Sequence, residues 1–146
     1  MGGKNDPMLR LLSSIAVDPD DVRAWFAEYL DAYAACGRGE APTDSLLDWY
    51  GLPFLVATDA GFAALTTPEQ VVAAVQPQID GMRAGAFAWT AIAADHVTVL
   101  NATSAIYRGT FSHRDGDGHE IRRLTVTYLV TAGTDGRRIS LLAVQP

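Results

Sequence analysis

The sequence predicts an α+β domain in which helices cover one face of a curved antiparallel sheet. In the first half of the chain, apolar residues recur at helical spacing. In the second half they alternate along segments that Asp–Gly turns separate, which is the pattern of hairpin-linked strands. A length of 146 residues corresponds to one domain. We expect residues 1–17 to form an N-terminal arm and residues 18–146 to form the domain.

The composition bears on the possible partners and the compartment. The chain has 11 basic and 17 acidic residues, a net charge of −6, which argues against a cationic surface for nucleic acid. Its one cysteine, Cys36, permits no internal disulfide. The apolar run from Met8 to Val17 is far shorter than the roughly 20 residues of a spanning helix. We therefore expect a cytoplasmic protein that binds neither nucleic acid nor membrane.

The first predicted helix covers residues 19–36. Asp18 can cap the free backbone N–H groups, and Pro19 suits the first helical position. Gly37 and Gly39 mark its end. Apolar and aromatic side chains follow at helical spacing, so one face of this helix should be buried: Val22, Trp25, Phe26, Tyr29, Leu30, Tyr33 and Cys36.

Two further helices and a hairpin are predicted before the long strands. A short helix fits residues 44–50, and residues 54–57 and 62–65 read as the two strands of a small hairpin. Thr67–Gln70 is a capping box with proline at the first helical position. It begins a third helix that ends near Met82.

The remainder of the chain is predicted to form a meander of strands. A turn is expected around Asp95–His96, and further turns at the Asp–Gly pairs. Between residues 121 and 131 the even positions from Leu124 to Val130 are apolar and should face the helices, whereas the threonines take the other face. The predicted strands are 87–93, 97–100, 103–113, 121–131 and 139–144.

Several strings within residues 18–145 resemble the nuclear transport factor two-like superfamily, which includes ketosteroid isomerases and SnoaL-like polyketide cyclases. They are VRAWFAEYLDAY, LLDWYGLPFLVATDAG, TTPEQVVAAV, SHRDGDGHE and TAGTDGRRIS. The resemblance implies a cone-shaped curved antiparallel sheet wrapped around three N-terminal helices, also called a cystatin-like fold. It further implies an apolar pocket between helices and sheet, and a homodimer formed through the outer sheet face.

The resemblance also suggests where catalytic groups would lie. Ketosteroid isomerases use a tyrosine on the first helix, an aspartate on the small hairpin and a protonated aspartate on a late strand. Tyr29 or Tyr33 matches the tyrosine, but strand 54–57 carries no acid and strand 121–131 carries no aspartate. The sequence therefore departs from that isomerase mechanism at two of its three positions.

Asp48 is the carboxylate that we expect at the pocket mouth, because Trp49 and Tyr50 follow it directly. Burial against these rings would raise its pKa and suit it to acid–base chemistry, with Tyr29 and Tyr33 as its partners. The alternative interpretation is that Asp48 is a surface acid of the short helix.

Seven aromatic residues are candidates for binding a flat apolar molecule, with tyrosine hydroxyls as polar contacts. Each of them is also explained as ordinary core. They are Trp25, Trp49, Tyr50, Phe54, Trp89, Tyr107 and Tyr128.

Acidic residues and histidines gather at the turn between the two longest strands. His113 and His119 flank this turn, which also holds Asp115 and Asp117. A solvated turn explains this group better than a metal site does, and no glycine-rich phosphate loop is present. We predict neither a metal nor a cofactor.

Three functions remain open. The first hypothesis is a proton-transfer enzyme of the isomerase or cyclase type that acts on an apolar, polyketide-like or steroid-like molecule. Alternatively, it is a non-catalytic ligand-binding module with the same pocket. The third reading is a dimerisation domain whose core is filled. The fold alone does not separate them, because one fold hosts many functions.

Overall fold

A computed structural model describes residues 18–146 as an α+β fold with three helices beside a six-stranded sheet. The predicted arm, residues 1–17, lies outside the described residues. The helical elements are α2 (Pro19–Gly37), the 3-10 helix η2 (Thr43–Asp48) and α3 (Pro68–Ala84). The strands are β1 (Tyr50–Thr58), β2 (Gly61–Leu65), β3 (Trp89–Asn101), β4 (Ser104–Arg114), β5 (Glu120–Gly133) and β6 (Gly136–Gln145).

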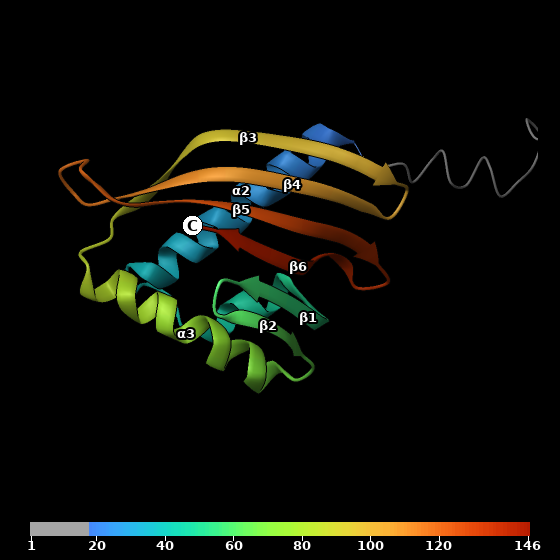
Figure 1. Cartoon of the computed structure of the whole chain (residues 1–146), viewed down its shortest axis with the longest axis horizontal. Helices are drawn as coiled ribbons and strands as arrows, with labels where there is room; N and C mark the ends of the chain where they lie inside the picture. Colours follow the sequence, from blue (N-terminus) through green and yellow to red (C-terminus); the bar gives the residue numbers. More distant parts are fainter. Residues whose placement is uncertain (1–17) are drawn as a thin grey trace, which may run out of the picture.

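The sheet has the order β2-β1-β6-β5-β4-β3. Neighbouring strands are antiparallel, except that β1 runs parallel to β6. Figure 1 shows long, bent β3, β4 and β5 crossing over α2, while α3 lies beside the small β1–β2 hairpin. The helices and the concave side of the sheet therefore enclose the core, which confirms the predicted cone-shaped fold.

Helix α2 begins and packs as its sequence predicts. The Asp18 carboxylate accepts the backbone N–H of Asp20 at 2.8 Å, and Pro19 occupies the first turn. On the buried face, the Phe26 ring stacks on Tyr107 of β4 with ring centroids 3.8 Å apart. This face fixes α2 against the concave side of the sheet.

Helix α3 begins at the predicted capping box. The Thr67 hydroxyl accepts the Gln70 N–H at 3.2 Å, and the Gln70 side chain accepts the Thr66 N–H at 2.8 Å. Val71, Ile79 and Met82 are its buried residues. None of the helices in residues 18–146 is both long enough and apolar enough to cross a membrane.

The second predicted helix is wrong in type and in length. Residues Thr43–Asp48 form a 3-10 helix, and Tyr50 already belongs to β1. The helix ends early because the chain at Trp49 and Tyr50 pairs with β6. The Ile139 N–H donates to the Trp49 carbonyl at 2.8 Å. A strand pairing that is distant in sequence therefore ends the helix early.

The turn expected at Asp95–His96 is also wrong. Both residues lie inside β3, where they pair with Gly109 and Arg108 of β4. A register shift between Ile92 and Ala94 interrupts the pairing locally. This irregularity lets one strand bend and continue over Trp89–Asn101, instead of breaking into two.

The two faces of β5 match the predicted alternation. Leu124, Val126, Tyr128 and Val130 are buried, whereas the threonines between them are only half-buried. Tyr128 pairs with Tyr107 of β4 and with Leu142 of β6. The even positions of β5 thus line the concave side of the sheet.

Candidate functional site: a cavity lined by tyrosines

A cavity of about 150 Å³ lies between α2, α3 and the concave side of the sheet. Four tyrosines contribute to its wall, Tyr29 and Tyr33 from α2, Tyr50 from β1 and Tyr128 from β5. We call it the tyrosine cavity. Its remaining wall is mostly apolar and includes Leu30, Phe54, Val75, Phe111, Val126 and Leu142.

Tyr29 lies close to the other three tyrosines of the wall. The hydroxyls of Tyr29 and Tyr50 form a hydrogen bond of 2.7 Å in which either can donate. The rings of Tyr33 and Tyr128 lie 5.9 and 6.1 Å from the Tyr29 ring. Because one hydroxyl proton is used in the Tyr29–Tyr50 bond, the other stays available to a bound acceptor.

Burial keeps these phenols protonated. Desolvation raises the pKa of Tyr29, Tyr33, Tyr50 and Tyr128 above its ordinary value of about 10. Repulsion between neighbouring phenolates raises the pKa of Tyr29 further. The tyrosines are therefore hydrogen-bond donors at neutral pH, not bases.

His113 is the one histidine in the cavity wall, and it is buried on β4. Its ring meets the Phe87 ring edge-on at 5.3 Å. Burial, and secondarily the charge of Arg122, lower its pKa below the ordinary value of about 6.5. The imidazole is thus neutral at pH 7, the state in which it can accept a proton.

The cavity wall contains tyrosines, His113, Gln78 and two threonines as its polar residues, and no Asp or Glu among residues 18–146. Such a site binds neutral or anionic oxygen through hydroxyl donors and surrounds the remainder of a ligand with apolar side chains. The described wall holds no set of residues suited to a metal, whose ligands would be carboxylates or several imidazoles.

Five predicted site residues are brought together in this wall: Tyr29, Tyr33, Tyr50, Phe54 and Tyr128. They come from α2, β1 and β5, which are distant in sequence. The predicted faces of helix 19–36 and strand 121–131 account for the positions of Tyr29, Tyr33 and Tyr128. Tyr50 instead reaches the wall from β1, where a helix was predicted.

The three tryptophans that were predicted to bind the ligand do not line the tyrosine cavity. The ring centroids of Trp25 and Trp49 are 5.3 Å apart, and that of Trp49 is 6.0 Å from the Tyr29 ring centroid. The two tryptophans therefore pack next to Tyr29 without lining the cavity themselves. The expectation that Trp89 faces the pocket is wrong. Trp89 is 46% exposed, because it pairs with Arg114 while its neighbour Thr90 points into the cavity.

Tyr107 and Asp48 also lie outside the wall. Tyr107 is buried core, and its hydroxyl donates to Asp95 at 3.0 Å. Asp48 is exposed at the end of η2, so it does not sit at the pocket mouth as expected. The aromatic residues after it turn inward, whereas its own side chain does not.

His113, Gln78 and Phe111 are wall residues that the sequence analysis did not select. The signal for two of them was present. His113 and Phe111 share the parity of buried Tyr107 on the same strand, so alternation along β4 places them on the concave side.

The carboxylates and histidine at the β4–β5 turn form a structural turn. Asp115, Asp117 and His119 offer ligand atoms within 4.8 Å of one another. The Asp115 carboxylate, however, accepts the backbone N–H groups of Asp117 and His119 at 3.0 and 2.9 Å. These bonds explain the cluster without a metal ion.

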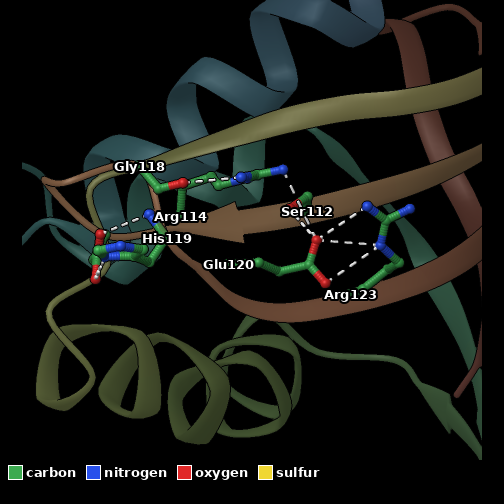
Figure 2. A network of polar contacts seen from close by, with 7 residues as sticks. Ser112, Arg114, Gly118, His119, Glu120 and Arg123 are labelled. Atoms are coloured by element: carbon green, nitrogen blue, oxygen red, sulfur yellow. Dashed lines mark hydrogen bonds and ion pairs between the residues drawn. The ribbon is translucent and has the colours of Figure 1, made fainter.

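Next to this turn, the Glu120 carboxylate has three polar partners (Figure 2). Its carboxylate accepts from the Ser112 hydroxyl at 2.6 Å and from Arg123 at 3.0 Å, and Arg114 lies 3.9 Å away. Figure 2 shows Arg114 and Arg123 on either side of Glu120. Glu120 thus pairs directly with Arg123 and more distantly with Arg114, whose guanidinium also donates to the Gly118 carbonyl.

The fold and the cavity together define an NTF2-like domain. The sequence matches the family described as NTF2-like protein (DUF6841) over residues 20–146, and the chain belongs to this family. No curated protein matches the sequence.

Solved structures show the same fold at low sequence identity. An NTF2-like protein with a cystatin-like fold from Novosphingobium aromaticivorans is 16% identical, with a TM-score of 0.63, over 97% of this chain and 90% of that one. An NTF2-like protein of unknown function from Shewanella oneidensis is 14% identical, with a TM-score of 0.60, over 83% and 96%. A putative calcium/calmodulin-dependent protein kinase II association domain from Xanthomonas campestris is 18% identical, with a TM-score of 0.59, over 86% of each chain. These likenesses establish the fold.

Proposed function

We propose that this protein binds a small, largely apolar molecule that carries a carbonyl or hydroxyl oxygen. The observation that supports this function is the Tyr29–Tyr50 hydroxyl pair, which lies within an otherwise apolar cavity wall. An oxygen acceptor on the ligand would receive the hydroxyl proton that this pair leaves unused. The apolar wall would contribute affinity by removing the remainder of the ligand from water.

The size of the cavity narrows the class of ligand. A volume of about 150 Å³ equals that of an apolar cavity that holds one benzene molecule. The proposed ligand therefore has one ring, and we set aside the larger polyketide-like and steroid-like molecules that the family resemblance suggested.

Calorimetric titration with acetophenone and with ethylbenzene tests this function. The two molecules have nearly the same shape, but only acetophenone has an acceptor oxygen. We expect acetophenone to bind about fivefold more tightly, since one hydrogen bond contributes roughly 1 kcal/mol. The double variant Tyr29→Phe/Tyr50→Phe should remove most of this difference, because either hydroxyl of the pair can donate to the ligand. Failure of both molecules to bind would contradict the proposed function.

A second candidate function is proton transfer, and the neutral imidazole of His113 in the cavity wall favours it. We propose His113 as the base in place of the exposed Asp48. His113 would take a proton from the carbon beside the ligand carbonyl, and tyrosine hydroxyls would stabilise the enolate oxygen. Return of the proton to carbon would complete the reaction.

Exchange of the acetophenone methyl protons in D2O, followed by proton NMR, tests this second function. We expect faster exchange with the protein than with buffer, and no acceleration with His113→Gln. Acetophenone binding by this variant would show that its cavity is intact. Equal exchange rates with and without the native protein would leave the protein as a binding module.

We further propose that two copies pair through the outer face of the sheet, the side opposite the helices. Leu55, Leu141, Leu129 and Ile106 lie in register across β1, β6, β5 and β4 on this face. A continuous aliphatic row of this kind is suited to a self-complementary contact. Light scattering should give twice the chain mass of 15.6 kDa, and Leu129→Glu should give the monomer.

A further inference from the structure

A second hollow of about 270 Å³ adjoins the tyrosine cavity, and we call it the vestibule. Its wall comes from α3, from the segment after it and from β4 and β5. Gln78 and His113 belong to the walls of both hollows. A molecule that extends from one into the other therefore passes these two side chains.

Arg122 of β5 brings a positive charge to the vestibule. It pairs in register with His113 of β4, so the two side chains are neighbours on one face of the sheet. Among residues 18–146, Arg122 has no hydrogen bond or ion pair. The next residue, Arg123, differs in this respect, because Glu120 accepts its hydrogen bonds in the network of Figure 2.

Arg122 is exposed, and no acidic side chain among residues 18–146 pairs with it. No Asp or Glu occurs among the residues that line either hollow within 18–146. The neighbouring His113 is neutral at pH 7, partly because the guanidinium lowers its pKa. The vestibule thus presents one formal positive charge beside a neutral imidazole, which matches a ligand with one negative charge.

We infer that the ligand of the tyrosine cavity is a small aryl carboxylate whose ring occupies that cavity and whose carboxylate meets Arg122 in the vestibule. This inference rests on the proposed binding function and adds a charged end to the ligand. A guanidinium recognises a carboxylate through two parallel N–H···O bonds. The His113 imidazole, directly opposite, can donate a further N–H to the same group.

Calorimetric titration with 3-phenylpropionate and 3-phenylpropan-1-ol tests this inference. The probes share the ring and the chain length and differ in the charged end. We expect the native full chain to bind the carboxylate about tenfold more tightly than the alcohol, because hydrogen bonds to charged groups are the stronger ones. Raising the salt concentration should weaken binding of the carboxylate and leave the alcohol unchanged.

Two variants locate the effect. Arg122→Gln should bind the two probes equally, and its affinity for the alcohol should match that of the native chain. Arg108→Gln is the matched control, because it removes the same charge from an exposed arginine on the opposite face of the sheet, next to Gln145. This control should retain the preference for the carboxylate.

The outcomes separate the two proposals. Equal affinity of the native chain for both probes, or a preference that survives in Arg122→Gln, would overturn the role of Arg122 and leave the proposed binding function standing. Binding of neither probe by a chain that still binds acetophenone would overturn the inference alone, whereas binding of none of the three molecules would overturn the proposed function as well.

Discussion

The hydroxyls of Tyr29 and Tyr50 lie 2.7 Å apart and join α2 to β1 inside the core. Both residues are buried, with 1% and 5% exposure. A helix residue and a strand residue 21 positions apart thus satisfy each other's polar atoms. The same bond supports the structure and prepares a hydroxyl donor for a ligand.

Removing one of these hydroxyls should destabilise the fold. We expect Tyr29→Phe or Tyr50→Phe to lower the free energy of unfolding by about 1–2 kcal/mol, since each leaves the other hydroxyl buried without its partner. The double variant should lose less than the sum of the two, which urea denaturation would measure as a coupling energy. Strictly additive losses would show that the bond contributes nothing.

All five tyrosines of the chain should resist ionisation while the protein is folded. Burial is the largest cause that raises the pKa of each one, including Tyr107. Unfolded tyrosines ionise near pH 10 and the folded ones above it, so stability should be constant below about pH 10 and fall as the pH rises further. Absorbance at 295 nm should report phenolate together with loss of circular dichroism. Phenolate appearing in the folded protein near pH 10 would contradict this.

Much of the tyrosine cavity was predictable, because local patterns place its residues. Helical spacing after the Asp18 cap directs Tyr29 inward, and alternation along β5 directs Tyr128 to the same side. Both patterns depend only on residues that are near one another in sequence. The buried faces of α2 and β5 agree with them. The predicted caps at Asp18 and Thr67 form for the same reason.

The remaining features depend on pairing between distant strands. The bulge in β3 sets which side Trp89 and Thr90 take, and it arises from register with β4. The parallel pairing of β1 with β6 ends η2 early, and no local pattern indicates it. The vestibule likewise depends on register, since Arg122 lies beside His113 only through the β4–β5 pairing.

His113 should make the protein less stable in mild acid. Its pKa is lowered in the folded state, so the unfolded chain takes up the proton first as the pH falls. Stability should therefore be constant above about pH 6.5 and decline below it. Urea denaturation at several pH values should show this slope reduced in His113→Gln. An unchanged slope in that variant would assign the loss of stability to other groups. His96→Asn is the control, because it removes a histidine at an exposed position.

Asp48→Asn should leave ligand binding unchanged. The carboxylate is exposed and is not part of the wall of the tyrosine cavity. Calorimetric titration with acetophenone should give the native affinity, within twofold. A large loss of affinity would return Asp48 to the site as the sequence had suggested. The double variant Tyr29→Phe/Tyr50→Phe is the positive control, because it removes both hydroxyl donors of the pair.

Gly109 of β4 should tolerate no side chain, because two aromatic rings close over it. A Cβ atom there would lie 2.5 Å from the Phe111 ring and 2.9 Å from the Tyr107 ring. These two rings are parallel within 6°, and both stack with Phe26 of α2, so neither can move without disturbing the contact between helix and sheet. We expect Gly109→Ala to lower the free energy of unfolding by about 1–3 kcal/mol, the usual cost of overpacking a core.

Gly81→Ala gives the opposite expectation and serves as its control. A Cβ at Gly81 meets nothing within 4 Å, and the residue lies within helix α3. Alanine is favoured over glycine in a helix by roughly 0.5–1 kcal/mol, so this variant should be slightly more stable. Urea denaturation of both variants gives the comparison. Equal stability of Gly109→Ala and the native chain would mean that the Tyr107 and Phe111 rings rearrange freely, and Phe111 would then no longer define the wall of the tyrosine cavity.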